Sequence, residues 1–361
     1  MFLKPGENFA RAMALWNGRP SGRLMWTTYF YEPLRRWAEQ TGYADSADFV
    51  ERELGAMQYA AFESVVDFKE PQVEVARRRE GEITTLEYKS PWGALTEVMK
   101  ADRYLKHRVA SAEDLKIQIK MWENVEVTPA PERFDKTMAK WRGRAPVVIV
   151  KGSSAIQQMI QYIFSVEDFW FAMSDYTALM EQAFETWEAL QRKAYEIGTA
   201  FPADAFYEDE NTSTTLISPG YYRRYSLAHI RAYSDAVHKV GKRFVVHMCG
   251  HLRDLMTTFP ETGLDGIDCL TPPPVGNCAF EYAYRVMPKD FFCTGRFGTS
   301  LWHDRTRGEI MANLAAILPH EIYRDHAFVL AVTGDGMKDI PLDNIRLLRD
   351  CINDYEKQGG R

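Results

Sequence analysis

The chain has no excess of basic residues and no apolar run long enough to cross a membrane. Its formal net charge is −6. Proteins that bind nucleic acid need a basic surface for the phosphates, so we expect no nucleic-acid partner. The opening residues 1–6 lack the apolar segment of a secretory leader. We therefore expect a cytoplasmic protein that does not associate with membranes.

Cysteine is also scarce, and its number is odd. The chain has five cysteines, and four of them lie between Cys249 and Cys293. In a reducing compartment such residues are more often metal ligands, nucleophiles or core residues than partners in disulfides. This part of the chain is therefore the first place to look for chemistry.

A dinucleotide-binding fingerprint is missing too, because no Gly-x-Gly-x-x-Gly follows the first expected strand. The composition, 46% hydrophobic and 26% charged, is that of a globular protein and excludes disorder or a coiled coil. The length of 361 residues allows two ordinary domains or one large α/β barrel.

What the chain does contain is a regular alternation of short apolar runs and helical patterns. A helix is expected over residues 5–22, and each of the later runs is followed by helical spacing. Such alternation predicts parallel strands with crossover helices. Eight runs favour a (β/α)₈ TIM barrel over the alternative, a doubly wound open sheet. The expected strands lie near residues 24, 65, 147, 206, 245, 267, 292 and 329.

Residues 70–100 have a different texture, with polar and apolar residues alternating between turn residues. This pattern predicts an antiparallel β-meander. We interpret it as an insertion within a single barrel domain that spans residues 1–361.

The candidate chemistry centres on residues 243–256, where a strand pattern changes to helical spacing at Gly250. His247 and Cys249 stand two residues apart, so both would point to the same face at the end of the strand. Imidazole and thiolate are favoured zinc ligands. The alternative is structural, because cysteine is often a core residue and a histidine can simply bind a backbone carbonyl.

In a barrel, chemistry occurs at the carboxyl ends of the strands. Further zinc donors could come from Glu208, Cys269, Cys293 or Asp335, and we take Glu208 and Asp335 as candidate catalytic residues. Cys269 and Cys293 could equally be core, Asp335 a turn residue, and the acidic run at 208–210 a solvated loop. The residues expected at that end to contact substrate are Tyr29, Tyr31 and Arg296.

Several short motifs recur in the order found in one known family. Together they resemble the uroporphyrinogen decarboxylase superfamily, and most closely its cobalamin-dependent methyltransferase branch. The resemblance spans nearly the whole chain and rests on Ser90-Pro-Trp-Gly93, Ser218-Pro219-x-x-Tyr222, His247-x-Cys249-Gly250, Leu264-Asp-Gly-Ile-Asp268 and Pro341-Leu-Asp-Asn344.

The resemblance implies a zinc ion held by His247 and Cys249. In the family the third ligand is a cysteine after a glycine at the end of the last strand, a position that falls on Asp335 here. Either Asp335 substitutes, or Cys269 takes over, or zinc is weak or absent. The arginines that hold porphyrinogen carboxylates after strand one are missing from residues 26–32, so porphyrinogen decarboxylation is not expected.

The activity implied is transfer of a methyl group between a small methylated substrate, or a thiol or folate acceptor, and the corrinoid (cobalamin) of a partner protein. The alternative is a metal-free lyase of decarboxylase type, which would cluster Lys151 and Arg296 in its pocket. A third hypothesis is a barrel that only binds ligands. The family resemblance also allows a homodimer. The identity of the methyl donor and acceptor and the direction of transfer stay open.

Overall fold

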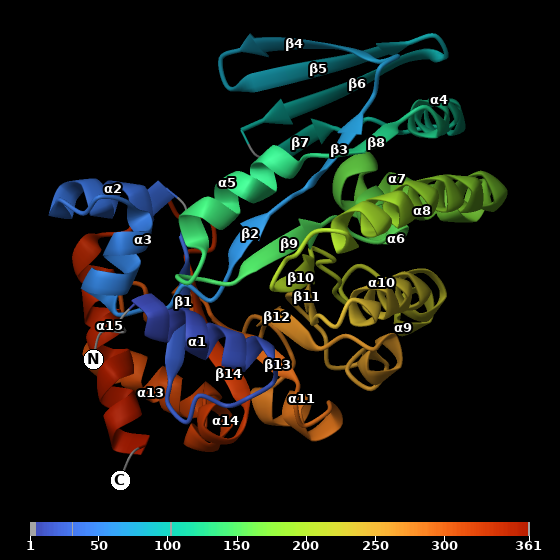
Figure 1. Cartoon of the computed structure of the whole chain (residues 1–361). Coiled ribbons are helices and arrows are strands. Elements are labelled where there is room, and N and C mark those ends of the chain that lie inside the picture. Colours follow the sequence, from blue (N-terminus) through green and yellow to red (C-terminus); the bar gives the residue numbers. More distant parts are fainter. Residues whose placement is uncertain (1–4, 31, 102, 360–361) are drawn as a thin grey trace.

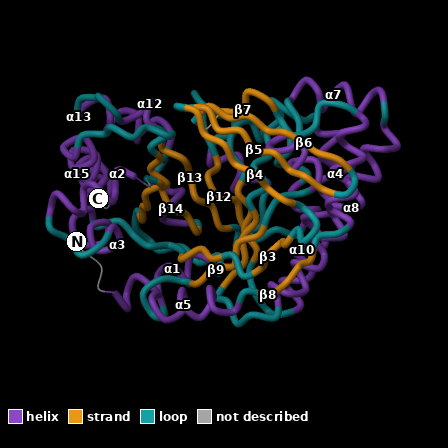
Figure 2. The backbone as a smooth tube through the Cα atoms, turned by 90° about the horizontal axis from the view of Figure 1, so that it is seen from above, coloured by secondary structure: helices purple, strands orange, loops and turns teal. Residues whose placement is uncertain are grey.

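The computed structural model describes residues 5–30, 32–101 and 103–359. Its centre is a curled sheet of eight parallel strands surrounded by helices (Figures 1 and 2). This confirms the predicted (β/α)₈ barrel class. The strands, in their order around the sheet, are β1 (Met25–Tyr29), β14 (Ala327–Thr333), β13 (Phe292–Phe297), β12 (Gly266–Leu270), β11 (Phe244–His247), β10 (Ala205–Glu208), β9 (Val147–Lys151) and β2 (Ala61–Glu63).

The second expected strand is misplaced in the prediction. The barrel strand is β2, whereas the run expected near residue 65 forms β3 (Val66–Lys69), which pairs antiparallel with β8 (Glu126–Pro129) outside the barrel. Val65 is fully buried between the two strands. A short apolar run has the same sequence pattern whether it forms a barrel strand or a strand outside the barrel, so the pattern could not distinguish the two.

The inserted β-meander is confirmed and runs slightly further than expected. It is a four-stranded antiparallel sheet of β4 (Glu74–Glu80), β5 (Ile83–Ser90), β6 (Gly93–Lys100) and β7 (Arg103–Lys106). Figure 1 shows it standing apart from the barrel strands, next to α4. Its small apolar core joins Tyr88 and Leu95 to Met121 of α4, while β4 is exposed along its whole length.

Local sequence signals account for several helix starts. Thr306 accepts a hydrogen bond from the Glu309 amide while the Glu309 carboxylate accepts from the Thr306 amide, which is a capping box at the start of α13.

No helix in the described residues is long and apolar enough to span a membrane. The helices are α1 (Pro5–Trp16), α2 (Glu32–Thr41), α3 (Ser46–Asp48), α4 (Ala112–Glu123), α5 (Pro131–Trp141), α6 (Ala155–Gln158), α7 (Val166–Asp175), α8 (Thr177–Thr199), α9 (Pro219–Tyr221), α10 (Leu227–Lys239), α11 (Phe280–Val286), α12 (Thr299–Trp302), α13 (Arg307–Ile317), α14 (His320–Asp325) and α15 (Leu342–Gly359).

Alternate residues of the barrel strands belong to two different cores. One core contains the side chains of Val148, Val245 and Phe292, and α1 adds Trp16 to it. Their strand neighbours belong to the larger core between the sheet and the helices. Because side chains alternate between faces, position parity decides whether a polar residue at a strand end faces the barrel interior or the helices.

The seam between β1 and β2 is closed without a strand ladder. These two strands are the ends of the sheet order. The Met57 amide, just before β2, donates to the Trp26 carbonyl of β1 at 2.8 Å. Trp16 Nε1 of α1 donates to the Tyr59 carbonyl at 2.7 Å. The segment before β2 is therefore fixed by β1 and α1, which sets the place of Tyr59.

A buried charged cluster holds α8 and α10 against β10. His229 Nδ1 lies 2.6 Å from Glu188 Oε2, and His229 Nε2 lies 2.9 Å from Glu208 Oε1. Tyr195 Oη adds a hydrogen bond of 2.5 Å to Nε2. Burial alone would lower the pKa of His229, but the two carboxylates raise it to about 10. The side chain of Glu208 therefore points from β10 toward the helices and away from the barrel interior.

We expect His229→Gln to destabilise the fold in a pH-dependent way. The change leaves two carboxylates facing each other without a cation, so the free energy of unfolding should fall by about 3 kcal/mol at pH 6. Because the pKa of His229 is raised in the folded state, its contribution is fully present below its unfolded pKa of about 6.5 and is lost as pH rises toward 10. The difference from wild type should therefore shrink between pH 6.5 and 10 in urea titrations.

The matched control is His238→Gln, because His238 pairs with Asp265 but its side chain is 41% exposed. We expect a change of less than about 1 kcal/mol there. A His229→Gln effect that stays constant across this pH range would contradict the assignment of a charged, doubly paired imidazole.

Candidate functional site

A cavity of about 380 Å³ opens at the carboxyl ends of the barrel strands, where barrel enzymes place their chemistry. Its lining comes from β1, the segment before β2, β2 itself, and the ends of β9 to β12. The lining residues are Thr27, Thr28, Tyr29, Phe30, Gln58, Tyr59, Ala60, Phe62, Val150, Tyr207, Asp209, His247 and Asp268.

Asp268 of β12 organises this cavity. Its carboxylate is buried and accepts five side-chain hydrogen bonds. Burial by itself would raise the pKa of Asp268, but these donors, His247 first among them, hold it below its ordinary value. Oδ1 accepts from Tyr29 Oη (2.5 Å), Tyr59 Oη (3.1 Å) and Thr294 Oγ1 (2.6 Å), and Oδ2 accepts from Tyr207 Oη (2.9 Å) and His247 Nδ1 (2.8 Å).

The three tyrosines form an aromatic wall. Burial, followed by the Asp268 charge, raises the pKa of Tyr29, Tyr59 and Tyr207 well above the ordinary value, so the phenols stay protonated and donate. Phe62 extends the wall, with ring centroids 4.7 Å from Tyr207 and 5.6 Å from Tyr59. Because the tyrosine hydroxyls are hydrogen-bonded to Asp268, these residues can contact a ligand mainly through the surfaces of their rings.

His247 lines the cavity, and Cys249 lies next to it, with the two side chains in contact, although Cys249 is not in the lining. Burial lowers the pKa of His247, but the hydrogen bond to Asp268 and the neighbouring Cys249 raise it to about 10. Cys249 Sγ donates to Asn211 Oδ1 at 3.0 Å. With Nδ1 held by Asp268, Nε2 is the ring nitrogen available to a ligand. A histidine oriented by a carboxylate, beside a thiol, fits two ligands of a zinc ion.

Asp335, the expected third ligand, is engaged elsewhere. Its Oδ1 accepts from Arg296 Nη2 (2.5 Å) and Thr333 Oγ1 (2.6 Å). Its Oδ2 accepts from the Thr299 amide (2.8 Å) and Thr299 Oγ1 (2.7 Å), which caps α12. These donors hold the pKa of Asp335 below its ordinary value although burial opposes them. Across residues 5–30, 32–101 and 103–359, no three His, Cys, Asp or Glu side chains form a group that could hold a metal.

The other predicted residues divide between the two faces of the sheet. Tyr29 lines the cavity as expected, whereas Tyr31 lies outside the described residues. Glu208 is not in the cavity lining, because its position in β10 directs it to His229. Arg296 pairs with Asp335 and is not in the lining either. Cys293 is a fully buried core residue, which was the structural alternative.

Cys269 is the remaining thiol near the site. Its backbone has a φ of 65°, a left-handed value that is unusual for a residue with a side chain, and its amide donates to Thr294 Oγ1 at 2.7 Å. Burial, then the charges of Asp268 and Cys249, raises the pKa of Cys269 well above the ordinary value. The thiol is thus held protonated without a metal, whereas a bound zinc would deprotonate it, so Cys269 stays a candidate third ligand.

Four important residues were not selected as site residues from the sequence, namely Asp268, Tyr207, Asp209 and Tyr59, and Asp268 entered only as part of a family motif. Side chains alternate between the two faces of β10, and Ala205 faces the barrel interior. The same alternation could have placed Tyr207 and Asp209 on the interior face. Tyr59 precedes its strand and carried no pattern of its own.

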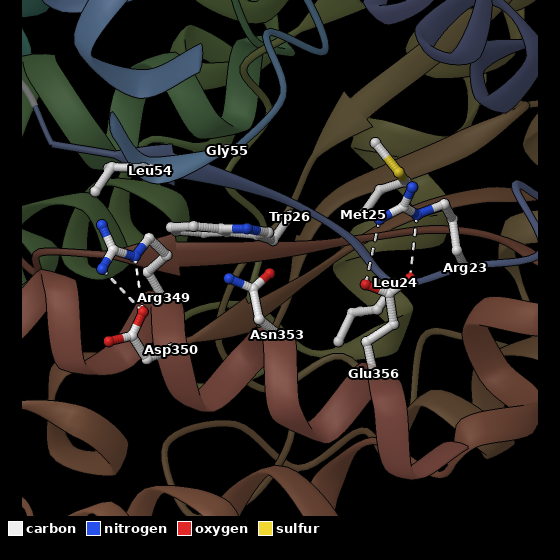
Figure 3. Close-up of a pocket in the computed structure, with 10 residues that line it drawn as sticks. All are labelled: Arg23, Leu24, Met25, Trp26, Leu54, Gly55, Arg349, Asp350, Asn353 and Glu356. Carbon is white, nitrogen blue, oxygen red and sulfur yellow. Dashed lines mark hydrogen bonds and ion pairs between the residues drawn. The ribbon is translucent and has the colours of Figure 1, made fainter. Parts of the chain in front are cut away.

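A second cavity, of about 330 Å³, lies between the start of β1 and α15 (Figure 3). Its charged side chains are already paired. Arg23 bonds Glu356 at 3.0 Å, and Arg349 bonds Asp350 at 2.9 Å. It lies at the amino end of β1, away from the carboxyl ends of the strands. The cavity around Asp268 is therefore the candidate active site.

Solved structures with similar folds include a methyltransferase from Methanosarcina mazei. It is 14% identical, the match covers 96% of this chain and 98% of that one, and the TM-score is 0.57. A chitinase from Chromobacterium violaceum matches with 9% identity, coverage of 92% and 98%, and a TM-score of 0.36. A D-psicose 3-epimerase matches with 9% identity, coverage of 70% and 85%, and the same TM-score. Only the first likeness carries weight, and it concerns the fold.

No curated protein matches the chain. One family profile does, and its description is uroporphyrinogen decarboxylase (URO-D). It matches residues 146–355, which is more than half of the chain and includes His247, Cys249 and Asp268. The chain therefore belongs to the uroporphyrinogen decarboxylase family.

Proposed function

We propose that this chain is a methyltransferase that binds zinc at His247 and Cys249 and exchanges a methyl group with the corrinoid of a partner protein. The observation that carries the proposal is the carboxylate–histidine pair of Asp268 and His247 beside the Cys249 thiol, at the edge of an aromatic cavity. A carboxylate that accepts a hydrogen bond from one ring nitrogen of a histidine orients the other nitrogen toward a metal. The fold of a Methanosarcina mazei methyltransferase, which aligns over nearly the whole chain, supports the same reaction class.

The chemistry of the cavity argues against the alternative, a metal-free lyase acting on a polycarboxylate. Substrate carboxylates need basic partners, yet no lysine or arginine is among the residues that line the cavity. The Lys151 ammonium lies 3.5 Å from the ring centroid of Tyr195, in the helix layer. Arg296 is held by Asp335. The two basic residues that the lyase hypothesis required are therefore engaged in separate places.

Asp268 would act as the positioning residue of the site. It fixes the His247 ring through Nδ1 and so presents Nε2 to the cavity edge. It also holds the hydroxyls of Tyr29, Tyr59 and Tyr207, which keeps their rings as the walls against which a substrate packs. Bound zinc would supply Lewis acidity, either keeping a thiol acceptor deprotonated or activating the bond to a leaving methyl group.

The cavity must also be reachable by a cofactor carried on another protein. Phe62, which forms part of the wall, is 38% exposed, and Asp209 is exposed as well. The mouth is thus open to solvent at the carboxyl ends of the strands. A corrinoid partner would dock over this rim.

We expect protein purified without added metal to contain about one zinc per chain, and Cys249→Ala and His247→Ala to lose it. Because the described residues supply two donors in place of the usual three, mild chelators should remove the metal readily. Elemental analysis before and after chelation measures this. The matched control is Cys351→Ala, which removes a thiol buried in α15. Wild-type protein that takes up no zinc when zinc is supplied would overturn the proposal.

Asp268→Asn should weaken zinc binding about 10- to 100-fold, because the neutral amide replaces the charged carboxylate that accepts from His247 Nδ1 and orients the ring. The measurement is a competition titration against a chromogenic chelator. Tyr207→Phe is the control, since it removes one donor to Asp268 and leaves the bond to His247 in place. Equal zinc affinity in Asp268→Asn and wild type, with both folded by circular dichroism, would contradict the positioning role.

A further inference from the structure

One charged side chain in the candidate active site has no counterpart. Asp209 follows β10, and its amide donates to the Lys151 carbonyl at 3.1 Å, which fixes its backbone. Within the described part of the chain its carboxylate forms no hydrogen bond or ion pair, in contrast to the five donors on Asp268. Partial burial, then the charges of Asp268 and Glu208, raises the pKa of Asp209, although His247 opposes this. The His247 imidazole of the same cavity is already bonded to Asp268, so a positively charged ligand would add compensation for Asp209.

Lys151, whose carbonyl accepts from the Asp209 amide, does not provide that charge. Lys151 is buried, and its ammonium lies over the ring of Tyr195, on α8. The acidic groups that act on it are Glu208, Glu188 and Glu210 of the helix layer. Lys151 and Asp209 both line a neighbouring cavity of about 210 Å³, but Asp209 is not among the carboxylates that act on the ammonium, and no ion pair joins the two side chains.

Part of the lining that Asp209 shares is aromatic. Tyr59, Phe62 and Tyr207 form a continuous cluster, with Phe62 in contact with both tyrosines. All three rings line the same cavity as Asp209. Aromatic faces carry negative electrostatic potential and attract alkylated ammonium groups, whose N-methyl groups also gain from apolar contact. The volume of about 380 Å³ suits a small molecule.

We propose that the cavity selects a small substrate carrying a methylated ammonium group, with Asp209 supplying the negative charge and Tyr59, Phe62 and Tyr207 packing on the N-methyl groups. This inference rests on the proposed function, since it names the class of methylated substrate for the same site. A neutral methyl ether or thioether would pack on the aromatic wall but would gain nothing from the Asp209 carboxylate.

The test compares two probes of the same shape. Choline carries a trimethylammonium group, and 3,3-dimethylbutan-1-ol carries an uncharged tert-butyl group in its place. We expect choline to bind wild-type protein at least about tenfold more tightly than the neutral alcohol in isothermal titration calorimetry. Asp209→Asn keeps the shape and removes the charge, so it should lose this preference. Asp135→Asn, which removes an exposed charge from α5, should retain it.

A second variant tests the aromatic half of the proposal. Phe62→Leu is partly exposed and should fold normally, and it should weaken choline binding more than binding of the neutral alcohol. Equal affinity of the two probes, no binding of either, or an unchanged preference in Asp209→Asn would overturn the proposal.

The titration uses protein stripped with a chelator, so it depends on neither zinc nor a corrinoid partner. Absence of zinc binding would therefore defeat the proposed methyltransferase function without affecting the measured preference. Loss of the preference in zinc-binding protein would defeat the substrate class alone.

Discussion

The carboxylate of Asp268 is the constraint on which the candidate active site depends. Its five donors come from β1, the segment before β2, β10, β11 and β13, so one side chain ties together most of the barrel circumference. A buried charge costs several kcal/mol unless it is paired and hydrogen-bonded, so these donors must be present together. Once they are, the phenol hydroxyls are consumed and the His247 ring is fixed. The site's shape follows from satisfying one charge.

The same rule operates on the other face of the sheet with opposite sign. There a cation, His229, is satisfied by Glu208 and Glu188. The acidic run after β10 is thereby divided, because Glu208 faces the helices while Asp209 lies at the cavity. Two adjacent carboxylates thus have different roles, one structural and one open to a ligand, and strand parity alone separates them.

The fold followed from sequence because its signals are local and repeated. Strand runs bounded by helical spacing predicted all the barrel strands but β2, whose run continues into β3. His247 and Cys249 were found because spacing on one strand determines a shared face. The rest of the site depends on contacts between residues far apart in the chain. Tyr59 reaches Asp268 across 209 positions, and no pattern in one segment encodes such a pairing.

Asp335 illustrates the same limit and bears on the proposed metal. The family resemblance implies a cysteine thiolate at this position. This chain has an aspartate there instead, and its carboxylate accepts four hydrogen bonds from Arg296, Thr333 and Thr299. The end of β14 is thus stabilised by an ion pair and a helix cap. Two protein donors leave more of the zinc coordination sphere to substrate than three do. A site of this kind would couple metal retention to substrate binding, because the occupied cavity completes the ligand set.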